Sequence, residues 1–379
     1  AVLQVSGGLG GLQRMGVHGG AAVHHRDGGD DAQSAHGDAL RVDPGARRRK
    51  VDDPGEVTDL RRMKRVLGIH HITAIAGAPR ENHRFYTEVL GLRLVKKSIN
   101  QDVPDTYHLF FADGDGHPGT DLTFFPWPDM GPGRIGAGVW GEVAFAVPVG
   151  SLDYWEARLQ DADVTTGERE TRFGEAVLPF TDPHGMSLAL VESEPHADHA
   201  FTAWDGSPVP ADRQIRALGG VRLTVRSVEA TAAFLSGAFG FGAGERDGDW
   251  VRYTVGEGAA GQRIDIRIDP EAPRGAWGVG AVHHVAFRIP DEEQELAVRE
   301  QITAHGGQAS PVIDRFWFKS VYVREPSGAL CEVATDGPGF GVDEDPAHLG
   351  ETLVLPPWYE SQRAAIEAVL VPLETTYHA

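Results

Sequence analysis

Two histidine pairs and one glutamate lie in three strand-like segments of this 379-residue chain. The pairs are His70–His71, in LGIHHITAIA, and His283–His284, in AVHHVAFRIP, and Glu332 lies in ALCEVAT. Adjacent side chains on a strand point to opposite faces, so only one histidine of each pair can face a common interior. Because two imidazoles and one carboxylate can bind a divalent transition metal, these segments predict a metal site.

The histidine pairs open the first and last of four similar units that must position them. Each unit reads as one strand, one helix and further strands, with helices expected near residues 79–90, 151–162, 228–239 and 291–306. Pro79 suits a first helical turn, Gly91 suits a helix end, and Ser151 is a candidate N-cap. Repetition at this period predicts an α+β fold built from four tandem βαβββ modules.

Composition and repetition divide the chain into five parts. Residues 1–62 have no apolar period and are expected to be a disordered extension, with the folded protein beginning near Met63. Residues 63–195 are predicted to form an N-terminal domain of two modules, and residues 213–336 a C-terminal domain of two modules. A linker rich in proline, aspartate and histidine covers 196–212, and a tail with a helix covers 337–379.

Charge and cysteine content exclude several classes of function. A formal charge of -20 argues against a nucleic-acid partner, and no stretch approaches the roughly 20 apolar residues of a membrane span. Cys331 is the only cysteine, so no intramolecular disulfide can form, and a cytoplasmic location is predicted. Cys331 neighbours Glu332 and should face away from the site, where we expect a buried apolar residue rather than a catalytic thiol.

The motifs of the chain resemble the vicinal oxygen chelate superfamily, which includes glyoxalase I, bleomycin-resistance proteins and extradiol dioxygenases. The likeness is strongest to its ring-cleaving hydroquinone dioxygenase branch. It covers about residues 67–373 and rests on GIHHIT, FYTEVLGLRLVKKSINQD, YHLFFAD, HPGTDLTFFPW, GSLDYWEARL, DRFWFKSVYVREPSGALCE and DGPGFGVDEDPAHLGE. It implies two vicinal oxygen chelate domains of two modules each.

The resemblance also implies a ligand set and an activity. It selects His71, His284 and Glu332 as ligands of Fe(II), although Mn(II) accepts the same ligands. The substrates would be O2 and a small hydroquinone-like aromatic molecule, whose ring opens beside a hydroxyl carbon. His70 and His283 either point away or hold ligands or substrate, and both are catalytic candidates. Assembly into a homo-oligomer is compatible with the sequence.

Further candidates come from the fourth module. Tyr322 matches a family tyrosine that would hydrogen-bond an oxygen of the substrate, unless it is a core residue. Arg315 matches a family arginine that would stabilise an oxyanion, unless it forms a surface ion pair with Asp314. Aromatic residues of the same segment either wall an apolar pocket or pack in the core (Phe316, Trp317, Phe318). Weaker candidates are His108 and Thr73.

Alignment of the modules separates the alternatives. The positions equivalent to Glu332 are Thr123 in the first module and Ala189 in the second, so the sequence offers no fourth ligand. A glyoxalase-type lyase or isomerase would need a carboxylate at Thr123, and a metal-free drug-binding protein would need no triad. At the position of His71, the other modules have Glu142 and residues 219–220, both glycine. Glu142 and Asp265 are expected to be solvated or hydrogen-bonded.

Overall fold

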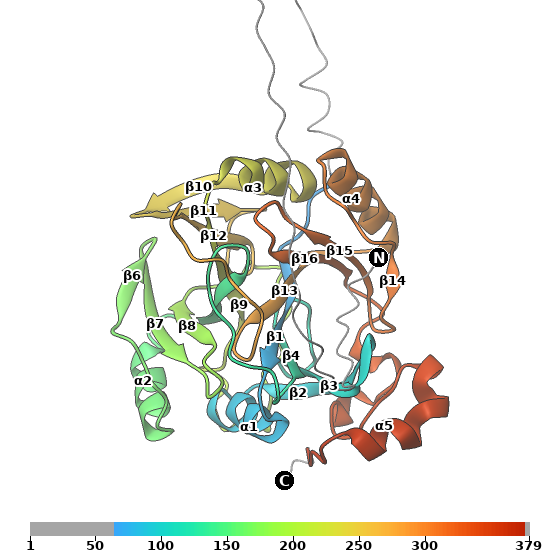
Figure 1. The fold of residues 1–379 in the computed structure, drawn as a ribbon. Helices are drawn as coiled ribbons and strands as arrows, with labels where there is room; N and C mark the ends of the chain where they lie inside the picture. The colour runs from blue at the N-terminus through green and yellow to red at the C-terminus, as the bar shows by residue number, and fades with distance from the viewer. Residues whose placement is uncertain (1–63, 376–379) are drawn as a thin grey trace, which may run out of the picture. The chain divides into compact units, whose positions relative to one another are not determined.

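A computed structural model describes residues 64–375 of the chain. The predicted disordered extension, residues 1–62, lies outside the described residues. Two eight-stranded sheets dominate the described part (Figure 1). Each of the four predicted modules contributes one strand, one helix and three further strands. The predicted α+β fold is therefore confirmed.

The first sheet contains modules one and four. Its order is β14-β15-β16-β13-β1-β4-β3-β2, so β1 and β13 meet in an antiparallel pair at its centre. The strands of the first module are β1 (Ile69–Ala76), β2 (Arg93–Asn100), β3 (Val103–Ala112) and β4 (Asp121–Pro126). Those of the fourth are β13 (Val282–Ile289), β14 (Ile313–Asp314), β15 (Lys319–Arg324) and β16 (Leu330–Thr335).

The second sheet repeats this plan with modules two and three. Its order is β10-β11-β12-β9-β5-β8-β7-β6, with β5 and β9 antiparallel at the centre. Its second-module strands are β5 (Trp140–Val147), β6 (Glu170–Arg172), β7 (Glu175–Thr181) and β8 (Ser187–Glu192). Its third-module strands are β9 (Ala217–Val225), β10 (Gly242–Asp247), β11 (Trp250–Thr254) and β12 (Arg263–Ile268). Each sheet takes one module from each predicted domain; the domain boundaries stay a prediction.

The main core lies where the two sheets meet. Trp140 of β5 and Phe287 of β13 are both buried, with ring centroids 6.4 Å apart. Nε1 of Trp140 also donates to the carbonyl oxygen of Leu330, at 2.7 Å. Since Phe287 and its neighbour Ala286 point to opposite faces of the strand, the other face of the first sheet remains for a site.

The helices follow the sequence prediction with one difference in capping. They are α1 (Pro79–Arg84) continued by the π-helix η1 (Phe85–Val89), α2 (Leu152–Asp161), α3 (Glu229–Phe234) continued by the π-helix η2 (Leu235–Phe239), and α4 (Glu292–Ala304). Ser151 precedes α2 but does not cap it, because its hydroxyl donates to the carbonyl oxygen of Pro148. Oε1 of Glu192 accepts from the amide of Leu152 instead.

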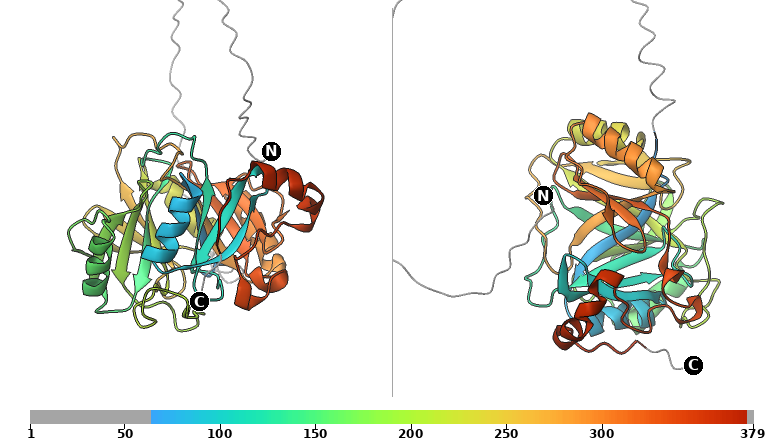
Figure 2. Two further views of the ribbon diagram at one scale, coloured as in Figure 1. Left: turned by 90° about the horizontal axis from the view of Figure 1, so that it is seen from below. Right: turned by 90° about the vertical axis from the view of Figure 1, so that its right-hand side faces the viewer.

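The C-terminal tail packs against the first module (Figure 2). It contains η3 (Phe340–Val342), η4 (Pro346–His348), η5 (Pro357–Gln362) and α5 (Arg363–Val369). Lys96 of β2 has no exposed side-chain area and pairs with Asp343 and Glu344 of the tail. Among residues 64–375, no helix is long and apolar enough to cross a membrane.

Candidate metal centre

The strand register brings the three predicted ligands to one face of the first sheet. Thr73 of β1 lies opposite His284 of β13, so His71, two residues from Thr73, shares its face. Ala286, two residues from His284, is the partner of Glu332 on β16. These pairings place ligands from the first and fourth modules on three adjacent strands, β1, β13 and β16.

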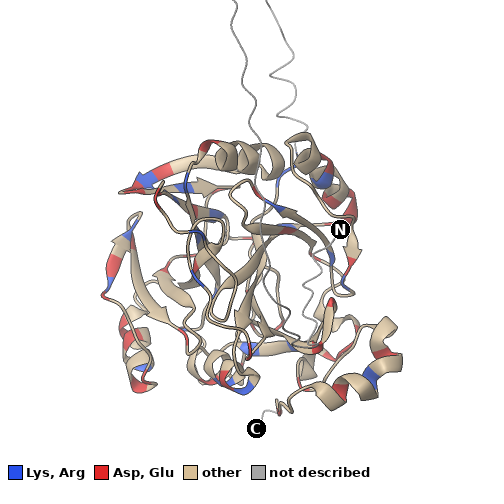
Figure 3. Cartoon of the chain, viewed as in Figure 1, with Lys and Arg blue, Asp and Glu red and all other residues tan. Residues whose placement is uncertain are grey.

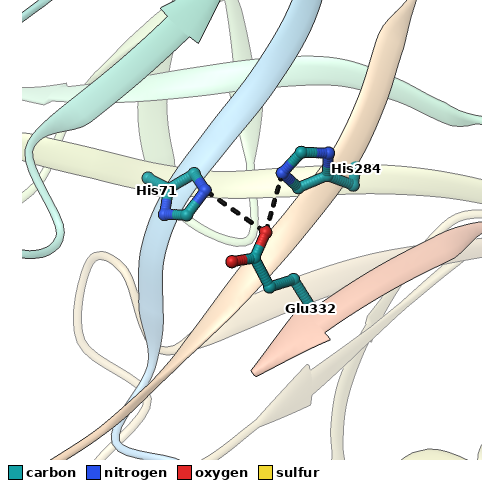
Figure 4. Close-up of side chains that lie close together, drawn as sticks. All are labelled: His71, His284 and Glu332. Carbon is teal, nitrogen blue, oxygen red and sulfur yellow. Dashed lines mark ion pairs between the residues drawn. The ribbon is translucent and has the colours of Figure 1, made fainter. Parts of the chain in front are cut away.

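The three side chains point toward one another (Figure 4). Oε2 of Glu332 lies 2.8 Å from Nε2 of His284 and 3.4 Å from Nε2 of His71. One potential ligand atom from each residue lies within 4.8 Å of the other two, and all three side chains are buried. Among the described residues, this is the only group of three or more such side chains arranged to hold a metal ion.

His70 determines which nitrogen of His71 faces the centre. Burial, with the nearby His71, lowers the pKa of His70 to about 3, so His70 is neutral. Its Nε2 lies 3.2 Å from the carbonyl oxygen of Thr335, which can only accept, and therefore carries the proton. Nδ1 of His70 must then accept from Nδ1 of His71, at 2.9 Å. Nδ1 of His71 is thus occupied by His70, and Nε2 is the nitrogen that faces the centre.

The carboxylate of Glu332 is incompletely satisfied by the protein. Ser320 donates to Oε1 at 2.6 Å, whereas Oε2 is buried and has no hydrogen-bond partner among residues 64–375. Burial raises the pKa of Glu332, but His71 and His284 hold it well below its usual range. The carboxylate is therefore anionic, and its Oε2 atom faces the Nε2 atoms of both histidines. A divalent cation fits this donor set.

The second histidine pair repeats the arrangement of the first. Nδ1 of His283 lies 2.8 Å from Nδ1 of His284, and the ring of His283 stacks on Trp277 with centroids 4.2 Å apart. Burial lowers the pKa of both His283 and His284, so both are neutral. His70 and His283 contact the ligands from behind and do not line the cavity in front of them. Their catalytic role stays a prediction, and the geometry favours positioning of the ligands.

A cavity opens in front of the three ligands. It is walled by aromatic side chains, namely Phe110, Phe125, Trp317 and Phe318. The predicted pocket wall is thus present for Trp317 and Phe318 but not for Phe316, whose ring lies against Trp358 instead, at 6.0 Å. Phe316 has a φ of 76°, and this left-handed conformation is rare for a bulky residue.

Tyr322 and Arg315 both line this cavity. Tyr322 is the cross-strand partner of Glu332, and its ring lies 5.8 Å from that of His284. Nε of Arg315 donates to the Tyr322 hydroxyl at 3.3 Å, and Nη2 pairs with Asp102 at 2.9 Å. Asp314 is not the partner of Arg315, because it accepts from the amide of Phe316. Burial raises the pKa of Tyr322, which Arg315 opposes only in part, so the phenol keeps its proton.

His108 and Thr73 meet at the position where a fourth ligand would stand. Thr123 occupies this position, and its hydroxyl is hydrogen-bonded to Nε2 of His108 at 2.9 Å and to the hydroxyl of Thr73 at 2.8 Å. Burial, together with His71 and His284, lowers the pKa of His108 well below its usual range, so its imidazole is neutral. A hydroxyl and a neutral imidazole therefore replace the carboxylate that a glyoxalase-type centre would need.

Some residues of the site were not predicted from the sequence. Ser320 holds Oε1 of Glu332, and its place two residues before Tyr322, on the same strand face, was a signal that could have identified it. Asn100, at the end of β2, and Gln101 and Asp102, in the turn that follows, also line the cavity. These three residues have no pattern that distinguishes them from an ordinary polar turn.

Both carboxylates that the alignment raised as further candidates are hydrogen-bonded to arginine. Glu142 accepts from Arg172, and Asp265 accepts from Arg252 at 2.8 and 3.0 Å. Burial raises the pKa of the Cys331 thiol well above its usual range, and its side chain lies in the main core.

The sequence is similar to that of known proteins over most of its length. The model of the Glyoxalase/Bleomycin resistance protein/Dioxygenase superfamily matches residues 68–190 and 217–333. MhqO of Bacillus subtilis, named as a ring-cleaving dioxygenase, is 43% identical over 82% of this chain and 98% of its own. The chlorohydroquinone/hydroquinone 1,2-dioxygenase of Sphingobium indicum is 34% identical over 78% of this chain and 94% of its own.

Solved structures show the same architecture. A dioxygenase structure from Bacillus subtilis is similar with a TM-score of 0.77 and 42% identity, over 83% of this chain and 100% of the other. Glyoxalase I from Zea mays is similar with a TM-score of 0.54 and 16% identity, over 72% of this chain and 93% of the other. This second likeness concerns the fold alone.

Proposed function

We infer, from the premise that this chain belongs to the Glyoxalase/Bleomycin resistance protein/Dioxygenase superfamily, that it is a ring-cleaving dioxygenase. Within that class we propose an Fe(II)-dependent, extradiol-type enzyme that opens hydroquinone-like rings beside a hydroxyl carbon. Both atoms of O2 enter the product, so the reaction consumes no external reductant. A cytoplasmic location and assembly into a homo-oligomer remain predictions.

The observation that carries the proposal is the unsatisfied donor set. His71, His284 and Glu332 offer three ligand atoms, and Oε2 of Glu332 has no hydrogen-bond partner among the described residues. Two histidines and one carboxylate on one side leave other coordination positions open, as in non-haem Fe(II) oxygenases. Bound there, Fe(II) would supply a Lewis acid and a redox centre shared by the substrate oxygen and O2.

The residues around the centre are suited to hold a phenol and move its protons. His108, neutral and in the cavity wall, can accept the proton of the substrate hydroxyl. The Tyr322 hydroxyl accepts from Arg315, so its own proton is free to be donated to an oxygen on the substrate. The guanidinium of Arg315 then lies near the negative charge that develops.

The aromatic walls would orient the ring and exclude water. Phe110 and Trp317 are almost completely buried, whereas Phe125 and Phe318 are 7% and 5% exposed. A flat apolar substrate fits between such walls, with its hydroxyl directed at the ligands. Para-diols and catechols share these features, so a comparison of their rates is needed to establish the preference.

Oxygen consumption by metal-loaded protein tests the proposal. Metal-free protein is loaded anaerobically with Fe(II), Mn(II) or Zn(II) and then mixed with hydroquinone or catechol in air-saturated buffer. We expect uptake of one O2 per ring with Fe(II), and none with Zn(II), which has no redox chemistry. The Glu332→Ala variant, treated identically, is the matched control.

Two results would contradict the proposal. One is the absence of oxygen uptake by protein that carries a full complement of Fe(II), with every diol tested. The other is turnover of a glyoxalase substrate, the adduct of methylglyoxal and glutathione, by the Zn(II) or Ni(II) form. That second result would establish a lyase despite the hydroxyl of Thr123.

A further inference from the structure

The second sheet has a cavity of its own on the counterpart strands. It lies over β5 and β9, as the metal centre lies over β13 and β1. Gly219 and Gly220 are at the position of His71, and the side chain of Arg263 packs against Gly220. No histidine lines the second cavity, and the described residues place no metal-ligand group there.

Charged side chains take the place of the metal ligands in the second cavity. Four arginines and three carboxylates line it, namely Arg172, Arg222, Arg252, Arg263, Glu142, Glu175 and Asp265. Figure 3 shows basic and acidic residues on the strands of this sheet. Glu170, which pairs with Arg172, brings the carboxylates to four, so the cluster as a whole is neutral.

Three of the four arginines are fully used by these carboxylates and their neighbours. Arg172 donates to both oxygens of Glu142, and Arg252 donates to both oxygens of Asp265. The Arg263 guanidinium donates to both oxygens of Glu175, to the hydroxyl of Ser193 and to the carbonyl oxygen of Gly219. These three arginines have little capacity left for a ligand.

Arg222 is the exception. Its side chain is only 17% exposed and makes no hydrogen bond with any residue in 64–375; its closest carboxylate oxygen, Oε1 of Glu142, lies 3.7 Å from Nε. The guanidinium instead stacks on Trp250, with its central carbon 4.2 Å from the ring centroid. Burial lowers the pKa of Arg222, because the buried guanidinium has lost part of its hydration, and the negative charge of Glu142 opposes this shift only in part. The Arg222 donors are therefore available, and their orientation is restricted by Trp250.

We propose that the second cavity is a binding site for a small monocarboxylate, held by the guanidinium of Arg222. A planar carboxylate matches the guanidinium fork and can accept two parallel charge-assisted hydrogen bonds from it. The remaining wall includes small apolar side chains, namely Ala144, Val177 and Val191, which suit a short aliphatic tail. This site is separate from the ring-cleaving centre and does not depend on the reaction proposed for it.

Saturation-transfer NMR with propionate as the probe tests the proposal on the full-length, metal-free protein, so that carboxylate binding to a metal cannot contribute. We expect transfer to propionate and none to propionamide, its neutral isostere. The Arg222→Gln variant should bind propionate at least about tenfold more weakly, the loss expected when hydrogen bonds between charged groups are removed. Arg222→Lys keeps the charge but not the planar guanidinium, so its affinity for propionate should lie between those of the parent and Arg222→Gln. This variant replaces Arg222→Gln in the test if Arg222→Gln fails to fold.

The matched control is Arg267→Gln. Arg267 also lies over the ring of Trp250, at 5.4 Å, but does not line the second cavity, so propionate binding should be unchanged. Equal binding of propionate by the parent and by folded Arg222 variants would overturn the proposal. Equal transfer to propionamide, or no transfer to propionate, would overturn it as well.

Discussion

At the scale of single residues, the Tyr322 hydroxyl keeps its proton, and a hydrogen bond from Arg315 holds its oxygen in place. Its hydroxyl accepts from Arg315, and burial raises its pKa, so the phenol acts as a hydrogen-bond donor toward the cavity. Its ring packs at 90° to that of His284, which a phenylalanine would reproduce. The hydroxyl and the ring can therefore be separated by one substitution.

We predict that Tyr322→Phe gives a folded, metal-loaded and slow enzyme. Loss of a positioned proton donor typically lowers a rate by about 10²–10⁴-fold, whereas this volume-matched change barely alters packing. Oxygen uptake with hydroquinone, metal content and melting temperature are measured together. Turnover at the parent rate would show that the tyrosine is a packing residue.

Glu332 permits a test of metal binding independent of catalysis. Its Oε2 atom is buried between two imidazoles and has no hydrogen-bond partner in the described part of the chain. We predict that Glu332→Ala loses most of the bound iron and remains folded, since the carboxylate is not part of an apolar cluster. Metal analysis after gel filtration measures the loss. Ser320→Ala, which removes only the hydrogen bond to Oε1, should retain more iron than Glu332→Ala. Full iron retention by Glu332→Ala would exclude Glu332 as a ligand.

At the scale of elements, α4 has a buried acid on the face that packs against the first sheet. Glu295 has no exposed area, and neither carboxylate oxygen has a hydrogen-bond partner within residues 64–375. Burial, followed by the charges of Glu332 and Glu292, raises the pKa of Glu295 from 4.5 to about 8. The folded protein therefore holds this proton at pH values where the unfolded chain has released it.

The sign of the resulting pH dependence follows from linkage. Between about pH 4.5 and pH 8 the native state binds more protons at Glu295 than the unfolded state, so its contribution to stability falls as pH rises through this window. We predict that Glu295→Gln removes this fall and melts at a higher temperature than the parent at pH 8.5, with little difference at pH 5. Glu293→Gln, at an exposed position of α4, is the control. Parallel melting curves for Glu295→Gln and parent across the window would contradict the assignment.

At the scale of the whole molecule, the two ends of the described chain share one sheet. The central pair of the first sheet joins β1 to β13, and the metal centre takes His71 from the first module and His284 and Glu332 from the fourth. Each predicted domain, taken alone, lacks half of both sheets. The site is therefore a property of the assembled chain rather than of either domain.

We predict that a chain cut in the linker, within residues 196–212, binds iron only when both halves are present. Each half alone exposes the edge of a central strand and lacks at least one ligand, so it should bind little metal and tend to aggregate. Co-expressed halves should restore the β1–β13 pair, the iron content and oxygen uptake. Stoichiometric iron binding by either half alone would contradict a site shared between the modules.

The sequence by itself determined the repeated modules and the identity of the candidate ligands. Alternation of side chains along a strand and the order of strand, helix and strands are local properties, so they are readable without a structure. The two histidine pairs and Glu332 stood out for this reason, whereas the family resemblance selected His71 and His284 within the pairs and matched Tyr322 to a family tyrosine. Their assignment as ligands still rests on the metal analysis proposed above.

Only the tertiary structure decided how distant segments complete the site. The tautomer of His71 depends on the carbonyl oxygen of Thr335, and Arg315 pairs with Asp102 rather than with the adjacent Asp314. The unused donors of Arg222 were also invisible, because they depend on which carboxylates the other arginines of the second cavity meet. Hydrogen-bond partners separated by hundreds of residues are set by sheet order and register, and these follow from the packing of the whole chain rather than from any local pattern.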